Sequence, residues 1–202
     1  MEPYYQDSHV TIYNADCREI LPDLPKVDLV LTDPPYGLAE RWQGGTWGNT
    51  EKVKLARKWD IKLTQNDIQL VVESGENCIL WGGNYYQMPP CRGLLAWVKL
   101  QKMPTMSDFE IAWTTFDKTA KCYESIRTPD GKSEHATAKP IKLMRWCIEQ
   151  AGNPETILDP FMGSGTTLRA AKDLNRKAIG IEISEKYCEI GAKRMAQEVM
   201  QF

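Results

Sequence analysis

Four consecutive residues, Asp33-Pro34-Pro35-Tyr36, bring a carboxylate, two prolines and an aromatic ring together directly after a strongly apolar segment. The prolines stiffen the backbone and remove two N–H donors, so the loop presents a carboxylate, bare carbonyl oxygens and a ring face. These groups suit the amino group of a planar base. The alternative interpretation is a structural Pro-Pro turn with a packed tyrosine, and the position directly after a buried strand disfavours it.

A second motif runs from the predicted strand 156–159 through a glycine-containing turn into a predicted helix. Gly163 and Gly165 permit positive φ and close approach of the backbone to a ligand. Glu182 follows Gly163 by 19 residues, about the spacing at which a carboxylate meets ribose hydroxyls in a nucleotide-binding βαβ unit. The full G-x-G-x-x-G pattern is missing because Leu168 stands at its last position. A nucleoside without phosphates is therefore favoured over a pyrophosphate, and a purely structural turn is the alternative.

The segments that must position these motifs are short β-branched runs separated by helical patterns, which is typical of an α/β fold. The run Val27–Thr32 is nearly all apolar, as expected of a strand buried on both faces. Segments 37–60 and 116–137 match neither pattern, and we interpret them as functional loops. The predicted helices span 65–75, 141–151, 166–174 and 184–198. The seven predicted strands are Val10–Asn14, Val27–Thr32, Asn77–Trp81, Leu94–Val98, Phe109–Thr114, Thr156–Asp159 and Ala178–Ile181.

Acidic residues gather where predicted strands end. Asp16, Asp33, Asp159 and Glu182 each lie at or just past the carboxyl end of a different strand, and the turn 82–84 follows another. Ligands of open α/β sheets bind at the carboxyl ends of the strands. We therefore expect these acids to share one edge of the sheet, which solvated surface charges would not be expected to do.

The composition of the chain indicates its size class, its charge and the kinds of site that it can form. The 202 residues suffice for one domain, with 42% hydrophobic and 26% charged residues, as in soluble globular proteins. A net charge of −2 means that any phosphate contact must come from a local basic patch. Six cysteines without C-x-x-C spacing and two histidines predict no metal site. No signal peptide or membrane-length apolar run is present, so we expect a cytoplasmic protein with no membrane partner.

Together these motifs resemble the DNA amino-methyltransferases, which make N6-methyladenine or N4-methylcytosine. The resemblance covers almost the whole chain from Asn14 onward, and the catalytic motif precedes the cofactor motif, as in the permuted beta class. It implies an α/β, Rossmann-like, S-adenosylmethionine-dependent methyltransferase fold. This fold has a seven-stranded, mostly parallel sheet with helices on both faces. It further implies S-adenosyl-L-methionine as cofactor and a prokaryotic or phage-infected cell as the setting.

The resemblance also implies roles for individual residues. Asp33-Pro34-Pro35-Tyr36 looks like the catalytic motif, Glu182 would hold the ribose hydroxyls, and Asp16 would read the adenine amino group of the cofactor. Lys139, in a segment similar to the family's H-x-T-x-K-P, would pair with the cofactor carboxylate. A solvated lysine before a helix is the alternative. The cofactor-binding residues expected in full are Asp16, Asp33, His135, Thr137, Lys139, Asp159, Phe161, Gly163, Ser164, Gly165, Thr166, Thr167 and Glu182.

The expected chemistry is methyl transfer to adenine N6. Asp33 and the Pro34 carbonyl would each accept one N–H hydrogen bond and direct the nitrogen lone pair at the methyl group, by position and preorganised acceptors alone. The base must be flipped out of a duplex or already unpaired, and Tyr36 would stack on it. Asp at the first motif position favours adenine by family usage. The alternatives are an N4-cytosine enzyme, an RNA-adenine enzyme, and a catalytically idle subunit that binds DNA or cofactor.

Recognition of DNA is expected from two loops of the single domain 1–202. The catalytic half would span 1–115, a short target-recognition segment 116–134, and the cofactor half 135–202. Because the recognition segment is short, we expect a short or degenerate site, or dependence on a second subunit such as a homodimer partner. Ordinary solvated charges are the alternative for each basic residue. The DNA-binding candidates are Arg41, Trp42, Lys52, Lys54, Arg57, Lys118, Lys121, Arg127 and Lys132.

Overall fold

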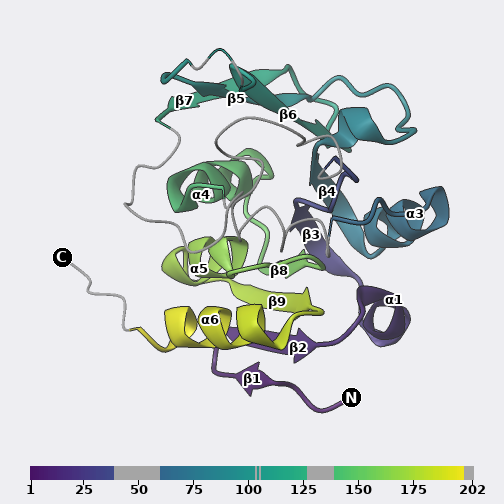
Figure 1. Cartoon of the computed structure of the whole chain (residues 1–202), viewed down its shortest axis with the longest axis vertical. Helices are drawn as coiled ribbons and strands as arrows, with labels where there is room; N and C mark the ends of the chain where they lie inside the picture. The colour runs from purple at the N-terminus through teal and green to yellow at the C-terminus, as the bar shows by residue number, and fades with distance from the viewer. Residues whose placement is uncertain (39–59, 103, 105, 127–138, 198–202) are drawn as a thin grey trace.

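A computed structural model describes residues 1–38, 60–102, 104, 106–126 and 139–197, and these residues form one mixed sheet with helices on both sides. The strands follow the order β1-β2-β9-β8-β3-β4-β6-β5-β7 (Figure 1). They are β1 Tyr5–Gln6, β2 Val10–Asn14, β3 Val27–Thr32, β4 Gly75–Trp81, β5 Leu95–Lys99, β6 Phe109–Thr114, β7 Lys121–Ser125, β8 Thr156–Asp159 and β9 Lys177–Glu182. The helices are α1 Cys17–Ile20, α3 Gln65–Glu73, α4 Ile141–Gln150, α5 Thr166–Asp173 and α6 Glu185–Ala196, with 3-10 turns η1 Leu21–Asp23 and η3 Gly83–Tyr85.

All seven predicted strands are present, and two further strands extend the sheet at its edges. β1 has only two residues, too few to show an alternating pattern. β7 is largely exposed and pairs with β5 alone, so its sequence is polar and lacks the apolar run of a buried strand. The expectation that 116–137 is a loop is therefore wrong for Lys121–Ser125. The count of seven strands is too low by these two edge strands.

The centre of the sheet is parallel, as expected. β2, β9, β8, β3 and β4 run in the same direction, whereas β6 is antiparallel to β4 and β5. β3 lies between β8 and β4, with Val30 opposite Leu158. The strand that carries the first motif therefore lies directly beside the strand that leads into the second, although the two strands begin 129 positions apart, at Val27 and Thr156.

Alternating side chains of β3 fill the two layers on either side of the sheet. Leu29 and Leu31 pack into the cluster formed with α4, α5 and α6, and Val30 packs into the cluster formed with α1 and α3. Figure 1 shows these two helix groups on opposite sides of the strands. Each of the three side chains is fully buried, which contributes about 1.5–3 kcal/mol per side chain. This two-sided burial fixes the position of the residues that follow β3.

Local signals set the helix ends. Thr64 caps α3, accepting from the Asp67 N–H while the Asp67 carboxylate accepts from the Thr64 N–H. The helix ends earlier than predicted because Gly75 already belongs to β4. Pro140 and Ser184 occupy the N-caps of α4 and α6, and neither side chain makes a cap hydrogen bond. Within the described residues, none of the helices is long and apolar enough to cross a membrane.

Candidate active site

The predicted gathering of acids at one edge is confirmed by the strand directions. Because β2, β3, β8 and β9 are parallel, their carboxyl ends lie at the same edge. Asp16 and Asp33 follow β2 and β3, while Asp159 and Glu182 end β8 and β9. Burial, with a smaller contribution from the charge of Asp33, raises the pKa of Asp159, so these two carboxylates are close enough to interact. This edge is the candidate active site.

The Asp33 carboxylate is held at both oxygens. The Tyr36 hydroxyl donates to Oδ1 and the Lys139 ammonium donates to Oδ2 at 2.6 Å. The two donors come from chain segments more than 100 residues apart. A carboxylate offers about four lone-pair positions, so these two bonds leave acceptor capacity for an incoming N–H group. Asp33 is thus fixed in place and still able to accept.

An aromatic stack supports the same loop. The rings of Tyr36 and Tyr85 lie 4.7 Å apart at 29°. Burial, followed by the charge of Asp33, raises the pKa of Tyr36 well above its ordinary value, so its hydroxyl stays a donor. The Tyr86 hydroxyl donates to the Pro35 carbonyl at 2.5 Å. Gly82 makes room for this arrangement, because a Cβ there would lie 2.1 Å from the Tyr36 ring.

A buried array of alternating charges continues from Asp33 into the sheet. Lys139 lies 3.1 Å from Glu110 on β6, and Glu110 also pairs with Lys99 at the end of β5. The side chains of Lys139 and Lys99 are 4% and 5% exposed. Burial favours the neutral form of Glu110, but Lys139 and Lys99 outweigh it and hold the pKa of Glu110 at about 2. The four side chains together carry no net charge.

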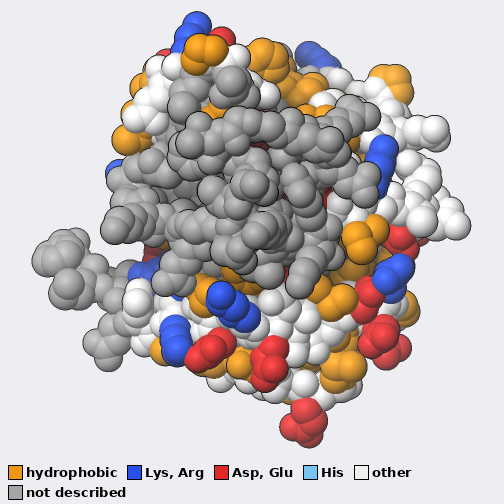
Figure 2. All heavy atoms as spheres, viewed as in Figure 1, with side chains coloured by type: hydrophobic (Ala, Val, Ile, Leu, Met, Phe, Trp, Pro, Cys, Tyr) orange, Lys and Arg blue, Asp and Glu red, His pale blue; other side chains and the backbone are white. Residues whose placement is uncertain are grey.

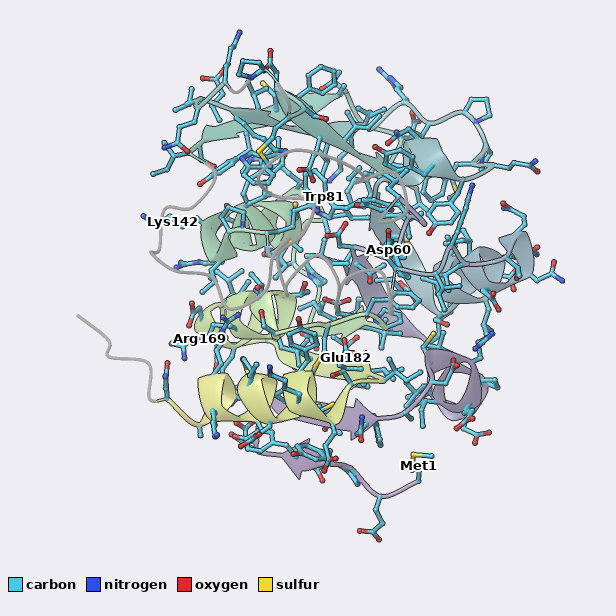
Figure 3. The ribbon with its side chains drawn as sticks, viewed as in Figure 1. Met1, Asp60, Trp81, Lys142, Arg169 and Glu182 are labelled. Carbon is cyan, nitrogen blue, oxygen red and sulfur yellow. The ribbon has the colours of Figure 1, made fainter. Side chains whose placement is uncertain are left out.

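The backbone that leaves the catalytic motif is anchored by Asp60. Its two carboxylate oxygens accept the N–H groups of Gly37 at 2.9 Å and Leu38 at 2.7 Å. Gly37 has φ of +71°, a conformation that favours glycine. Figure 3 shows Asp60 toward the middle of the molecule, between Trp81 and Glu182. Asp60 therefore fixes the exit of the loop, as Tyr36 and Lys139 fix its start.

The second motif forms the turn expected of a ligand loop. Gly163 and Gly165 have φ of +50° and +78°, and α5 begins directly afterwards. The Glu182 carboxylate accepts from Gly163 N at 3.0 Å and from Ser184 N at 2.8 Å, one bond to each oxygen. Burial raises the pKa of Glu182, although these two N–H groups oppose the shift. Each oxygen retains a lone pair, which suits two neighbouring hydroxyl groups.

Asp159 and its neighbours form the inner wall of this loop. Its Oδ1 accepts from the Thr32 hydroxyl at 2.7 Å and from Phe161 N at 3.2 Å. Burial raises the pKa of Asp159 to about 6, with the hydroxyl of Thr167 among the opposing influences. The hydroxyls of Ser164 and Thr166 instead accept from Arg194 on α6. These two residues therefore fasten the loop to α6.

Two of the expected cofactor contacts have other partners in the structure. The Asp16 carboxylate caps α1 and accepts three hydrogen bonds from Arg18, which lowers the pKa of Asp16. Lys139 contacts Asp33 and Glu110. Their cofactor roles stay predictions. Of the DNA-binding candidates, Lys118 donates to the Gln150 carbonyl at the end of α4, and Lys121 begins β7.

The remaining expected residues lie outside the described part of the chain. They are Arg41, Trp42, Lys52, Lys54, Arg57, Arg127, Lys132, His135 and Thr137. Among the described side chains, basic and acidic groups are interspersed around the lower rim of the face in Figure 2. No group of three or more potential metal ligands occurs among the described residues.

The turn 82–84 was expected at this edge, but several other residues of the site were not predicted: Gly37, Asp60, Tyr85, Tyr86, Lys99 and Glu110. Only the turn after Trp81 carried a usable signal, since it follows a predicted strand and contains two glycines beside two tyrosines. Glu110 and Lys99 lie inside strands, where a charged residue in an alternating pattern normally predicts an exposed face. Their pairing becomes visible only when β5 and β6 are placed beside Lys139.

Comparison with known proteins shows the family to which the chain belongs. A DNA methylase family model for N6 and N4 methyltransferases matches residues 49–193. Type II methyltransferase M2.DpnII of Streptococcus pneumoniae is 26% identical, covering 98% of this chain and 93% of that protein. Other type II methyltransferases are 41% and 44% identical over 75 and 72 residues, only 21% and 23% of their own length.

Solved structures share the fold. M1.HpyAVI in complex with S-adenosylmethionine has a TM-score of 0.60 at 24% identity, covering 93% of this chain and 100% of that chain. The cytosine-N4-specific PvuII DNA methyltransferase has a TM-score of 0.69 at 19% identity, covering 99% and 91%. These likenesses confirm the Rossmann-like methyltransferase fold.

The α/β fold is that of an S-adenosylmethionine-dependent methyltransferase. The chain belongs to the N6/N4 DNA methylase family, whose model matches more than half of its residues. The site is compatible with this family's cofactor, because each Glu182 carboxylate oxygen retains an acceptor position beside a loop with positive φ at Gly163 and Gly165. Carboxylates along the edge also suit a positively charged sulfonium.

Proposed function

We propose that this chain transfers a methyl group from S-adenosylmethionine to adenine N6 in DNA, with Asp33-Pro34-Pro35-Tyr36 as its catalytic centre. The observation that supports this most strongly is the position of Asp33. It follows β3 directly, its carboxylate is fixed by Tyr36 and Lys139, and β3 lies beside the strand that leads into the cofactor loop. A fixed acceptor next to a methyl donor is what transfer to an amino group requires.

The chain's own residues supply position and acceptors. When bound, S-adenosylmethionine supplies an electrophilic methyl group on a cationic sulfur. Asp33 accepts one N–H of the target amino group and the Pro34 carbonyl accepts the other, so that the nitrogen lone pair points at the methyl. A nitrogen–carbon bond forms as the sulfur–carbon bond breaks, and one nitrogen-bound proton leaves to water. Tyr36 provides the ring surface for a base that has left the helix stack.

Product analysis tests the choice of base. The protein is incubated with cofactor carrying a labelled methyl group and with duplex DNA, single-stranded DNA or RNA, and the nucleic acid is digested to nucleosides. We expect label in N6-methyl-2′-deoxyadenosine from DNA. Label in N4-methyl-2′-deoxycytidine, or in N6-methyladenosine from RNA, would overturn the substrate assignment, and no label in any sample would favour a catalytically idle subunit.

Substitution tests the catalytic role of Asp33. Asp33→Ala removes the proposed acceptor and should abolish methyl transfer, while cofactor affinity stays within about tenfold, an allowance of about 1.4 kcal/mol. Asp23→Ala is the matched control, because it removes an exposed carboxylate in the turn η1, outside the site and the proposed recognition segment. Wild-type turnover in Asp33→Ala would refute the assignment.

Recognition of the DNA site is proposed to involve segment 116–134 and the basic loops, with a short or degenerate site or a second subunit, such as a homodimer partner. The M2.DpnII relative is a type II methyltransferase, which suggests a role in restriction–modification. Plasmids from cells that express the chain can be mapped for modified adenines, and the protein's mass in solution can be measured. A long, strictly defined site produced by a monomer would contradict this proposal.

A further inference from the structure

Four charged side chains from four separate parts of the chain form one row, in which the two lysines are buried and the two carboxylates are partly buried. In order they are Lys99, Glu110, Lys139 and Asp33, with signs that alternate along the row. Glu110 contacts both lysines, and Lys139 contacts both acids. Only the Asp33 end reaches the catalytic loop. Lys99 and Glu110 lie on β5 and β6, away from the cofactor loop on β8.

Lys139 is confined on several sides. Its ammonium lies 2.6 Å from Asp33, 3.1 Å from Glu110 and 5.4 Å from the centre of the Trp81 ring. Burial alone would favour neutral Lys139, but the two carboxylates outweigh it and raise its pKa above the ordinary value. The following residue, Pro140, caps α4 and restricts the backbone of Lys139. The ammonium therefore remains charged and has little freedom to turn elsewhere.

We propose that Glu110 is a positioning residue for methyl transfer, because it holds the Lys139 ammonium on the Asp33 carboxylate. Lys99 neutralises the negative charge of Glu110. The inference rests on the proposed function, because it gives Asp33 the role of acceptor. It differs from the expectation that Lys139 mainly binds the cofactor carboxylate. Here Lys139 acts on Asp33, and Glu110 acts through Lys139.

Charge balance provides a test that separates positioning from stability. Glu110→Gln keeps the shape of the side chain but leaves two buried lysines facing one carboxylate, so the variant is destabilised. The double variant Lys99→Met with Glu110→Gln removes the surplus cation and restores neutrality. A merely structural role predicts that the double variant recovers both melting temperature and rate. A positioning role predicts that it recovers melting temperature but not rate, because Lys139 still lacks Glu110.

The measurements are kcat for transfer to DNA, the dissociation constant for S-adenosylmethionine, and the melting temperature. We expect kcat to fall by about 30-fold to 100-fold in both Glu110→Gln and the double variant. A small misplacement of a reacting group can lower a rate by about 100-fold. Cofactor affinity should change less than about threefold. Glu76→Gln at the start of β4 is the matched control, because that carboxylate is exposed and lies at the opposite end of its strand from the site, and it should change none of the three quantities.

Two results of the kinetic and binding measurements would overturn the inference. One is wild-type kcat in the double variant. The other is a loss of cofactor affinity of tenfold or more with kcat intact at saturating cofactor, which would make Lys139 a cofactor ligand. A crystal structure with cofactor gives a readout independent of turnover: we expect Lys139 within hydrogen-bond distance of Asp33 and Glu110, and an ammonium turned to the cofactor carboxylate would refute it. Active Asp33→Ala would instead refute the proposed function.

Discussion

Gly82→Ala should damage the active site through a residue that takes no part in the chemistry. Gly82 has φ of +68°, and a Cβ there would lie 2.1 Å from Cε1 and 2.3 Å from Cζ of Tyr36. Carbon atoms pack best at about 3.5–4.0 Å, so the ring must move by roughly 1.5 Å. That movement would disturb both the stack on Tyr85 and the hydroxyl that holds Asp33.

The cost has two parts that a second variant separates. A left-handed backbone costs an alanine about 1–2 kcal/mol, and overpacking against Tyr36 adds about 1–3 kcal/mol. Gly152→Ala carries the first cost without the second, because Gly152 has φ of +95° and no atom within 4 Å of a Cβ. At about 2–4 °C per kcal/mol, Gly82→Ala should lower the melting temperature by about 5–15 °C and Gly152→Ala by about 2–8 °C.

Activity gives the sharper comparison. We expect Gly82→Ala to lower the rate of methyl transfer by about 100-fold, the effect of displacing a catalytic group by about 1 Å, whereas Gly152→Ala should stay within about twofold of the wild type. The assays are thermal unfolding and transfer of labelled methyl groups to DNA below the melting temperature of both variants. Equal melting temperatures and wild-type rates in the two variants would show that Tyr36 does not need the space at Gly82.

Three further substitutions test other contacts. Burial raises the pKa of Asp159 to about 6 in the folded chain, against an ordinary value of 3.8. Between about pH 4 and pH 6 the folded chain therefore holds a proton that the unfolded chain has lost. The free energy of unfolding should fall by about 3 kcal/mol as the pH rises through this range. Asp159→Asn should flatten this slope in unfolding titrations, and an unchanged slope would contradict the buried-acid assignment. Tyr86→Phe removes the donor to Pro35 and should cost about 1 kcal/mol and lower kcat without weakening cofactor binding; a rise only in the cofactor dissociation constant would argue otherwise. Thr64→Ala should cost about 1 kcal/mol by removing the α3 cap, measured by denaturant unfolding, with no change in kcat per folded molecule.

The sequence predicts those parts of the site that depend on contiguous residues. Val27–Thr32 is nearly all apolar because both of its faces are buried, and this is why Asp33 could be placed at the end of a central strand. The order of parallel strands then puts Asp159 and Glu182 on the same edge. These predictions succeed because a strand's burial and a turn's glycines are properties of short segments.

The contacts that the sequence does not predict depend on chain segments far apart. Glu110 is part of the site only because β6 pairs with β4 and Lys139 returns beside it, and neither fact is contained in the residues around Glu110. Asp16 is expected to bind the cofactor, and in the structure its carboxylate accepts hydrogen bonds from the guanidinium group of Arg18, two residues away. β7 was missed because an exposed edge strand needs no apolar residues.

The strand order also determines when the protein can become active during folding. β9 lies between β2 and β8, and β8 lies between β9 and β3, so the early strands are completed by the late ones. Closing such long chain loops before any strand pairs is entropically unfavourable and slows folding. A nascent or truncated chain that ends before β9 carries the whole Asp33-Pro34-Pro35-Tyr36 motif but lacks Glu182 and Arg194, which hold the cofactor loop. Methylation should therefore begin only with complete chains, and amide exchange during refolding should show protection of β2 and β9 appearing together.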